Sequence, residues 1–129
     1  MFTVEQSYYI AYNFLNQYWF LVDKFRKYDI KDFTLVTIMD MRPVSISDPR
    51  SLDPAKYFDW QNVIAISFPG KTNFTETEVF QATIKYLEFY QREFAFNLSE
   101  VLADLHSDTA QKIWAQAVRD TLQLIEDAK

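Results

Sequence analysis

Carboxylates gather in one short stretch of the sequence, SISDPRSLDPAKYFDW, residues 45–60. Asp48, Asp53 and Asp59 lie close together there, with two arginines nearby. Such a group is able to perform general acid–base catalysis or to bind a hard cation. A helix explains the same residues more simply, because Asp53 followed by Pro54 is a favourable helix start. We therefore expect no enzyme, and neither a metal nor a cofactor.

The rest of the chain offers little other chemistry. His106 is the only histidine, and it stands at the expected end of a helix, where a cation is favoured by the helix dipole. No cysteine is present, so thiolate metal sites and a thiol nucleophile are excluded. A single glycine cannot supply a phosphate-binding loop or a dinucleotide-binding fingerprint.

Length and charge limit the class of protein. A chain of 129 residues predicts one domain, residues 1–129. The net charge of −5 argues against direct nucleic-acid binding, which needs clustered cations.

The absence of cysteine favours a location in the cytoplasm. The N-terminus lacks a basic signal-peptide region, and no apolar run is long enough to span a membrane, so we expect no membrane contact.

The periodicity of apolar residues predicts an all-α fold, a single-domain bundle of about six helices. The alternative is a small α+β domain, because TLVTIM (34–39) and NVIAISF (62–68) are rich in β-branched residues. The scarcity of glycine favours helices joined by short connections. The expected helices cover residues 4–27, 32–40, 53–67, 75–94, 98–106 and 108–127.

An internal similarity relates the two halves of the chain. Residues 2–18 align with residues 74–90 at a constant offset of 72, and each segment opens with a capping box, Thr3 with Gln6 and Thr75 with Glu78. Shorter similarities follow, in which Asn97 is expected to cap the fifth helix and Asp53 and Asp108 the third and sixth. The pattern predicts two pseudo-symmetric three-helix repeats, residues 2–68 and 74–128, whose long first helices pack together.

The first helix is apolar on nearly every side, with aromatic residues on two faces. Such a helix is either central to a bundle or part of an interface. We favour the central position, and a homodimer interface is the alternative. Substituting Trp19 or Trp60 by alanine is expected to cost about 3–5 kcal/mol.

The first half of the chain resembles a family of small acidic bacterial proteins associated with contact-dependent growth inhibition and other toxin–immunity systems. The resemblance covers residues 2–65. It is carried by Phe14-Leu15 with Tyr18-Trp19, by the helix from Asp32 to Met39, and by DPAKYFDW from Asp53 to Trp60, where Tyr57 replaces a tryptophan of the D-P-A-x-W-x-D-W pattern. It implies an immunity protein and no catalytic role.

An immunity protein of this kind would bind a cognate toxin, with a nuclease as one candidate, and cover its basic active-site cleft. Carboxylates would steer association, and exposed aromatics would act as anchors. The carboxylates expected to bind the partner are Asp48, Asp53, Asp59, Glu76 and Glu78. Two alternatives stay open: a non-catalytic homo-oligomeric adaptor, and a small enzyme that uses the acidic group at 48–59 with a metal.

Overall fold

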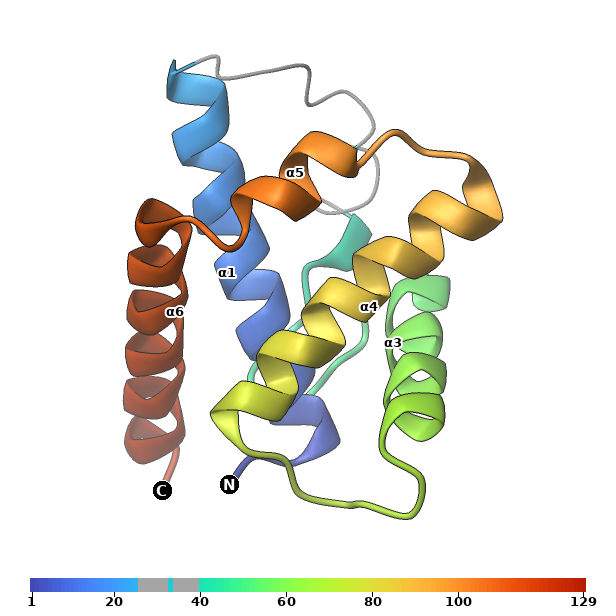
Figure 1. Ribbon diagram of the computed structural model, residues 1–129. Helices are drawn as coiled ribbons and strands as arrows, with labels where there is room; N and C mark the ends of the chain where they lie inside the picture. The colour runs from blue at the N-terminus through green and yellow to red at the C-terminus, as the bar shows by residue number, and fades with distance from the viewer. Residues whose placement is uncertain (26–32, 34–39) are drawn as a thin grey trace.

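The computed structural model describes residues 1–25, 33 and 40–129, which form a bundle of helices (Figure 1). The described helices are α1 (Val4–Phe25), α3 (Pro54–Ser67), α4 (Glu76–Phe94), α5 (Ser99–Asp104) and α6 (Asp108–Asp127). The all-α prediction is confirmed, because the described residues hold only two isolated β-bridges and no strand. The alternative strand at 62–68 is wrong, since these residues continue α3. The predicted helix at 32–40 and the alternative strand at 34–39 lie almost wholly outside the described residues.

Three helices begin as local capping chemistry predicts. The Thr75 hydroxyl accepts from the backbone N–H of Glu78, whose carboxylate accepts in return from the N–H of Thr75. Thr3 and Gln6 form the same reciprocal pair at the start of α1. Asp53 caps α3, with Pro54 at the first helical position.

The predicted caps of the last two helices are wrong. The Ser107 hydroxyl, and not Asp108, accepts the backbone N–H of Ala110 at the start of α6. Asn97 does not cap α5, which begins after Leu98 without a side-chain cap of its own. The side chain of Gln91 on α4 instead accepts the Leu98 N–H, at 3.0 Å. A neighbouring helix thus supplies the group that the sequence next to α5 lacks.

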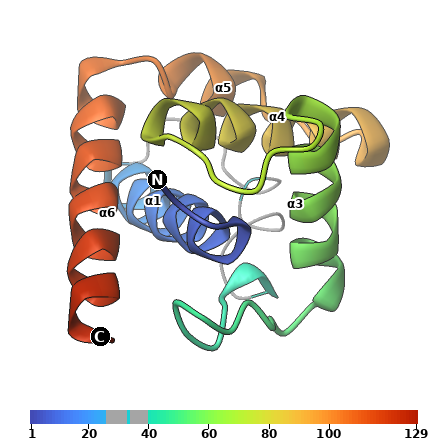
Figure 2. The ribbon, with the colours of Figure 1, turned by 90° about the horizontal axis from the view of Figure 1, so that it is seen from below.

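Helix α1 is central, as favoured from the sequence, and contacts α3, α4 and α6. Figure 2 shows α3 and α6 on opposite edges, with α1 and α4 between them. Helices α1 and α4 start side by side, because Phe2 and Phe74, just before them, exchange two backbone hydrogen bonds of 2.8 Å in an antiparallel bridge. Within the described part of the chain, no helix is both long and apolar enough to traverse a bilayer.

The contact of α3 with α4 corresponds to the contact of α6 with α1. Trp60 of α3 packs edge-on against Tyr86 of α4, at 5.5 Å between ring centroids, and Trp114 of α6 packs edge-on against Phe14 of α1, at 5.2 Å. Phe14 of α1 aligns with Tyr86 of α4 at the offset of 72. Helix α3 aligns with α6 at an offset of 54, which is the spacing between their caps Asp53 and Ser107. A two-fold relation between the halves requires such pairs, and the duplication itself stays a prediction.

Candidate partner-binding surface

The start of α3 is fixed by hydrogen bonds from both sides of Asp53. Its Oδ1 accepts the N–H of Ala55 at 3.0 Å, and its own N–H donates to the carbonyl of Asp40 at 3.2 Å. The Ser51 hydroxyl donates to the Asp53 carbonyl at 2.8 Å. Asp53 is half-buried. Its carboxylate therefore has a defined position and keeps one oxygen for an outside donor.

Asp59 lies less than two turns further along α3, and a second helix holds it in place. The Tyr90 hydroxyl of α4 donates to its Oδ2 at 2.6 Å. Burial, and after it the hydrogen bond to Asp59, raises the pKa of Tyr90 above its usual range, so the hydroxyl stays protonated at neutral pH. A half-buried carboxylate with a permanent donor on one oxygen presents the other in a fixed direction.

Lys56 lies on the inner face of the same helix and is 6% exposed. Its ammonium stands 4.4 Å from the centroid of the Tyr90 ring. Burial lowers the pKa of Lys56, while the nearby charges of Asp53, Asp40 and Asp59 oppose that shift. Lys56 therefore offsets part of the negative charge at this end of α3 from the inside.

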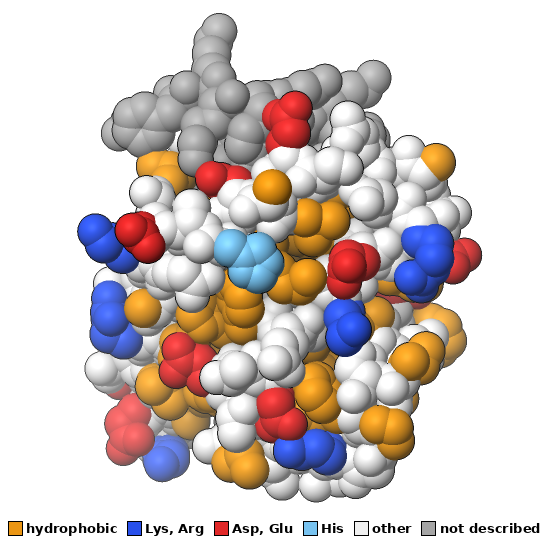
Figure 3. All heavy atoms as spheres, in the orientation of Figure 1, with side chains coloured by type: hydrophobic (Ala, Val, Ile, Leu, Met, Phe, Trp, Pro, Cys, Tyr) orange, Lys and Arg blue, Asp and Glu red, His pale blue; other side chains and the backbone are white. Residues whose placement is uncertain are grey.

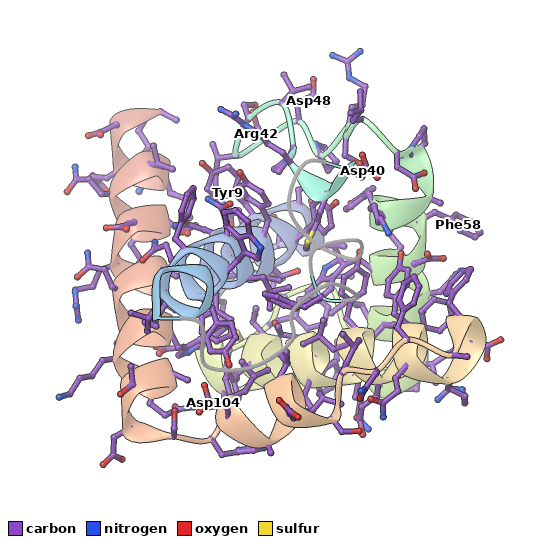
Figure 4. All side chains as sticks on the ribbon, turned by 90° about the horizontal axis from the view of Figure 1, so that it is seen from above. Tyr9, Asp40, Arg42, Asp48, Phe58 and Asp104 are labelled. Carbon is purple, nitrogen blue, oxygen red and sulfur yellow. The ribbon has the colours of Figure 1, made fainter. Side chains whose placement is uncertain are left out.

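Apolar side chains stand exposed beside these carboxylates. Phe58 is 61% exposed, and Figure 4 shows its ring pointing away from the bundle. Leu52, just before the cap, is 73% exposed. We call Asp53, Phe58 and Asp59 the α3-start surface. An exposed ring on the same helix as two hydrogen-bonded carboxylates combines an apolar anchor with electrostatic steering.

Asp48 belongs to a separate turn. Ser45 and Asp48 exchange backbone hydrogen bonds, and both Asp48 oxygens accept from the Arg50 guanidinium, the shortest distance being 2.6 Å. This pairing lowers the pKa of the Asp48 carboxyl. Because Arg50 already neutralises it, Asp48 attracts an outside cation less than Asp53 and Asp59 do.

Glu76 and Glu78 stand at the opposite end of α3, where the connection from α3 enters α4 (Figure 1). With 14 residues, α3 is about 21 Å long, which separates them from Asp53. Glu78 closes the capping box and pairs with Lys71 at 2.7 Å; the Lys71 hydrogen bond lowers its pKa. Glu76 is exposed. The five predicted carboxylates therefore form separate groups.

The described residues offer little for acid–base or metal chemistry. They contain no group of three or more histidine, cysteine or carboxylate side chains able to hold a metal ion. His106 is exposed, with its ring centroid 6.1 Å from that of Phe80, and Figure 3 shows the imidazole lying over apolar side chains. Acidic and basic side chains alternate on the face seen in Figure 3.

Residue type alone misleads about two side chains near the start of α3. Phe58 is exposed although it is aromatic, and Lys56 is buried although it is charged. The spacing of Lys56, Trp60 and Ile64, four residues apart, does contain the signal, because side chains so spaced share one helix face. Counting from the buried Trp60 places Lys56 inside and Phe58 outside.

Comparison with known proteins adds no relative from which a role could be transferred. No protein-family model, no curated protein and no solved structure matches this chain.

Proposed function

We propose that this protein is an immunity protein that binds and neutralises a cognate bacterial toxin. In this proposal it acts in the cytoplasm by binding alone, without catalysis and without touching nucleic acid. The α3-start surface would meet a basic cleft of the toxin, and a nuclease is one class with such a cleft.

The observation that carries the proposal is the exposed Phe58 ring on the same helix as two carboxylates that hydrogen bonds hold in place. Side chains already ordered before binding lose little entropy when a partner arrives. Exposed aromatics are the usual anchors of protein interfaces, and carboxylates speed encounter with a basic partner. The net charge of −5 acts in the same direction over longer distances.

The test is an affinity capture from the source organism, with the tagged protein as bait at low and at high salt. We expect a stoichiometric basic partner that is released by salt. That partner should be toxic when expressed alone and harmless when co-expressed with this protein. A captured partner without toxicity, or toxicity that this protein does not relieve, would contradict the proposal.

A variant of the α3-start surface assigns the contact. Asp53→Asn retains a capping side chain and Asp59→Asn retains an acceptor for Tyr90, so both remove charge while preserving local structure. Combined with Phe58→Ala, they should abolish protection against the toxin. The matched control removes two charges and one exposed apolar side chain elsewhere: Glu100→Gln, Glu126→Gln and Leu122→Ala. If both variants protect equally against the toxin, the α3-start surface is not the toxin-binding site.

The alternative function is a non-catalytic homo-oligomeric adaptor. It predicts that the capture returns only further copies of this chain and that the molecular mass rises with concentration.

A further inference from the structure

Three aromatic rings lie nearly parallel at the C-terminal end of α4. The Tyr90 ring is inclined by 21° to that of Phe94 and by 8° to that of Phe96, at 5.4 and 6.5 Å between centroids. Phe94 is 54% exposed, and Phe96 is half-buried. We call Tyr90, Phe94 and Phe96 the α4-end ledge. It presents an aromatic surface to solvent.

The backbone between the two phenylalanines is strained. Ala95 ends α4 with φ 54° and ψ 29°, and among the residues that the structure describes it is the only non-glycine residue with a positive φ. Glycine is the usual residue in this conformation, because a side chain is unfavourable there. The turn at Ala95 places Phe94 and Phe96 against the same Tyr90 ring. The ledge is therefore ordered before a partner arrives, and binding loses little side-chain entropy.

Tyr90 connects the α4-end ledge to the α3-start surface. Its hydroxyl donates to Oδ2 of Asp59 at 2.6 Å, and its ring stacks on Phe94. A half-buried carboxylate and an exposed ring therefore contact the same side chain. The other oxygen of Asp59 accepts no hydrogen bond from the described residues, so it is available to an outside donor.

The charges near Tyr90 favour a cationic ligand. Three carboxylates lie around the buried ammonium of Lys56: Asp40, Asp53 and Asp59. One cation among three anions leaves an excess of negative charge. Arg92, on the last turn of α4, does not change this balance, because it is already paired with Glu93 at 3.2 Å.

Rings at this end of α4 already accept cations of the same chain. The Lys56 ammonium stands 4.4 Å from the Tyr90 centroid, and the Arg92 guanidinium stands 6.0 Å from the Phe89 centroid. No cation of the described residues lies over Phe94. Phe94 is thus an exposed ring that a cation from outside is able to cover.

A guanidinium fits this site better than an ammonium does. It is planar, so it stacks on an aromatic face while the N–H groups at its edge donate to a carboxylate. The ammonium of lysine is a compact and strongly hydrated charge without a flat face to stack.

We propose that the α4-end ledge and Asp59 bind an arginine side chain of the toxin. The guanidinium stacks on Phe94 and donates to the free oxygen of Asp59. This inference rests on the proposed function for the identity of the partner, and it names the residue type that the α3-start surface selects from a basic cleft. Lysine in the same place keeps the charge attraction and loses the stacking, so the surface discriminates between the two cations.

The test compares two peptides of equal charge, hexa-arginine and hexa-lysine, each acetylated and amidated at its ends. Calorimetric titration of the full chain measures the affinity for each peptide at low and at physiological salt. We expect hexa-arginine to bind about two- to fivefold more tightly, which is the size of an exposed cation–ring contact. Salt should weaken the binding of both peptides. Equal affinities would overturn the proposal.

Matched variants locate the preference for arginine. Phe94→Leu keeps an apolar side chain and removes the ring, so it should abolish the preference and leave hexa-lysine binding unchanged. Phe20→Leu makes the same change at an exposed phenylalanine of α1 and should retain the preference. Asp59→Asn, which keeps an acceptor for Tyr90, should weaken hexa-arginine binding more than Glu126→Gln on α6 does. A preference that survives Phe94→Leu, or that Phe20→Leu also abolishes, would overturn the proposal.

These titrations need no toxin, so their outcome is separate from that of the affinity capture. A captured and neutralised toxin, together with equal affinities for the two peptides, would contradict the arginine site alone. A preference for hexa-arginine that Phe94→Leu abolishes would support the site even if the capture returned no toxin, and the immunity function alone would then be contradicted.

Discussion

The hydrogen bond between Tyr90 and Asp59 joins an outer helix to an inner one through a single pair of side chains. The donor is buried and the acceptor is half-buried, and the same aromatic ring lies against the Lys56 ammonium. Removing one partner leaves the other without its match in a partly dry site, which costs more than the bond itself contributes.

We expect Tyr90→Phe and Asp59→Ala each to lower the free energy of unfolding by about 1–3 kcal/mol. The double variant should lose less than the sum, with a coupling of about 1–2 kcal/mol, because both changes remove the same bond. Chemical denaturation of all four proteins measures this cycle. Additive losses would mean that the bond contributes nothing to stability.

The two tryptophans singled out from the sequence differ in burial, and so should their variants. Trp60 is fully buried, and its indole N–H donates to the Ser7 hydroxyl at 3.1 Å, whereas Trp19 is only half-buried. Trp60→Ala should cost about 3–5 kcal/mol of the free energy of unfolding and Trp19→Ala clearly less. Equal losses in denaturant titrations would contradict this ranking, which corrects the equal expectation from the sequence.

At the scale of helices, prediction from sequence succeeds where the stabilising groups lie within one turn of each other. The capping box of Thr75 and Glu78, and the pair of Asp53 and Pro54, are complete in a few residues, so they can be read directly. The start of α5 depends on Gln91, which belongs to another helix. No local pattern indicates that partner, and the local sequence points wrongly to Asn97 as the cap.

The start of α6 offers a direct comparison of the wrong cap with the observed one. Ser107→Ala removes the hydroxyl that accepts the Ala110 N–H and should lower the free energy of unfolding by about 1 kcal/mol. Asp108→Ala removes only a first-turn charge and should cost about 0.3–1 kcal/mol, decreasing with salt. A larger and salt-independent loss for Asp108→Ala would restore Asp108 as the cap.

At the scale of the whole molecule, the helical fold and the central place of α1 follow from the apolar pattern, but the grouping of charges does not. Glu76 and Asp53 look like members of one acidic set in the sequence, yet α3 holds them apart. Likewise, sequence similarity between the halves does not indicate that Gln17 of α1 donates a hydrogen bond to Asp120 of α6. Such differences depend on how side chains from separate helices meet.

Tyrosines make the bundle sensitive to alkaline pH. Burial raises the pKa of Tyr57 to about 12, and it also raises those of Tyr8, Tyr12, Tyr86 and Tyr90 above the usual 10. A pKa that is higher in the folded state gives stability that is complete below pH 10 and is lost as pH rises beyond it. Lys56, whose pKa is lowered, acts with the opposite sign, but it is one group against five tyrosines.

We therefore expect the free energy of unfolding to fall steeply above pH 10, with tyrosinate absorbance and loss of helical circular dichroism rising together. If the tyrosines ionise at a pH well below the one at which the helices unfold, burial does not raise their pKa.

Each half of the chain packs a long helix on a helix of the other half, and this arrangement leads to a prediction about folding. Helix α1 of the first half packs on α6 of the second, and α4 of the second packs on α3 of the first. A chain cut at the exposed Gly70 should therefore give two fragments, 1–70 and 71–129, that each lack most of their core contacts. Neither fragment should show a cooperative unfolding transition alone, since too little apolar surface is buried.

Mixed in equal amounts, the two fragments should form a 1:1 complex in which Trp60 and Trp114 regain native fluorescence. A fragment that folds by itself would show that the halves are independent units, contrary to the pairing of Trp60 with Tyr86 and of Trp114 with Phe14.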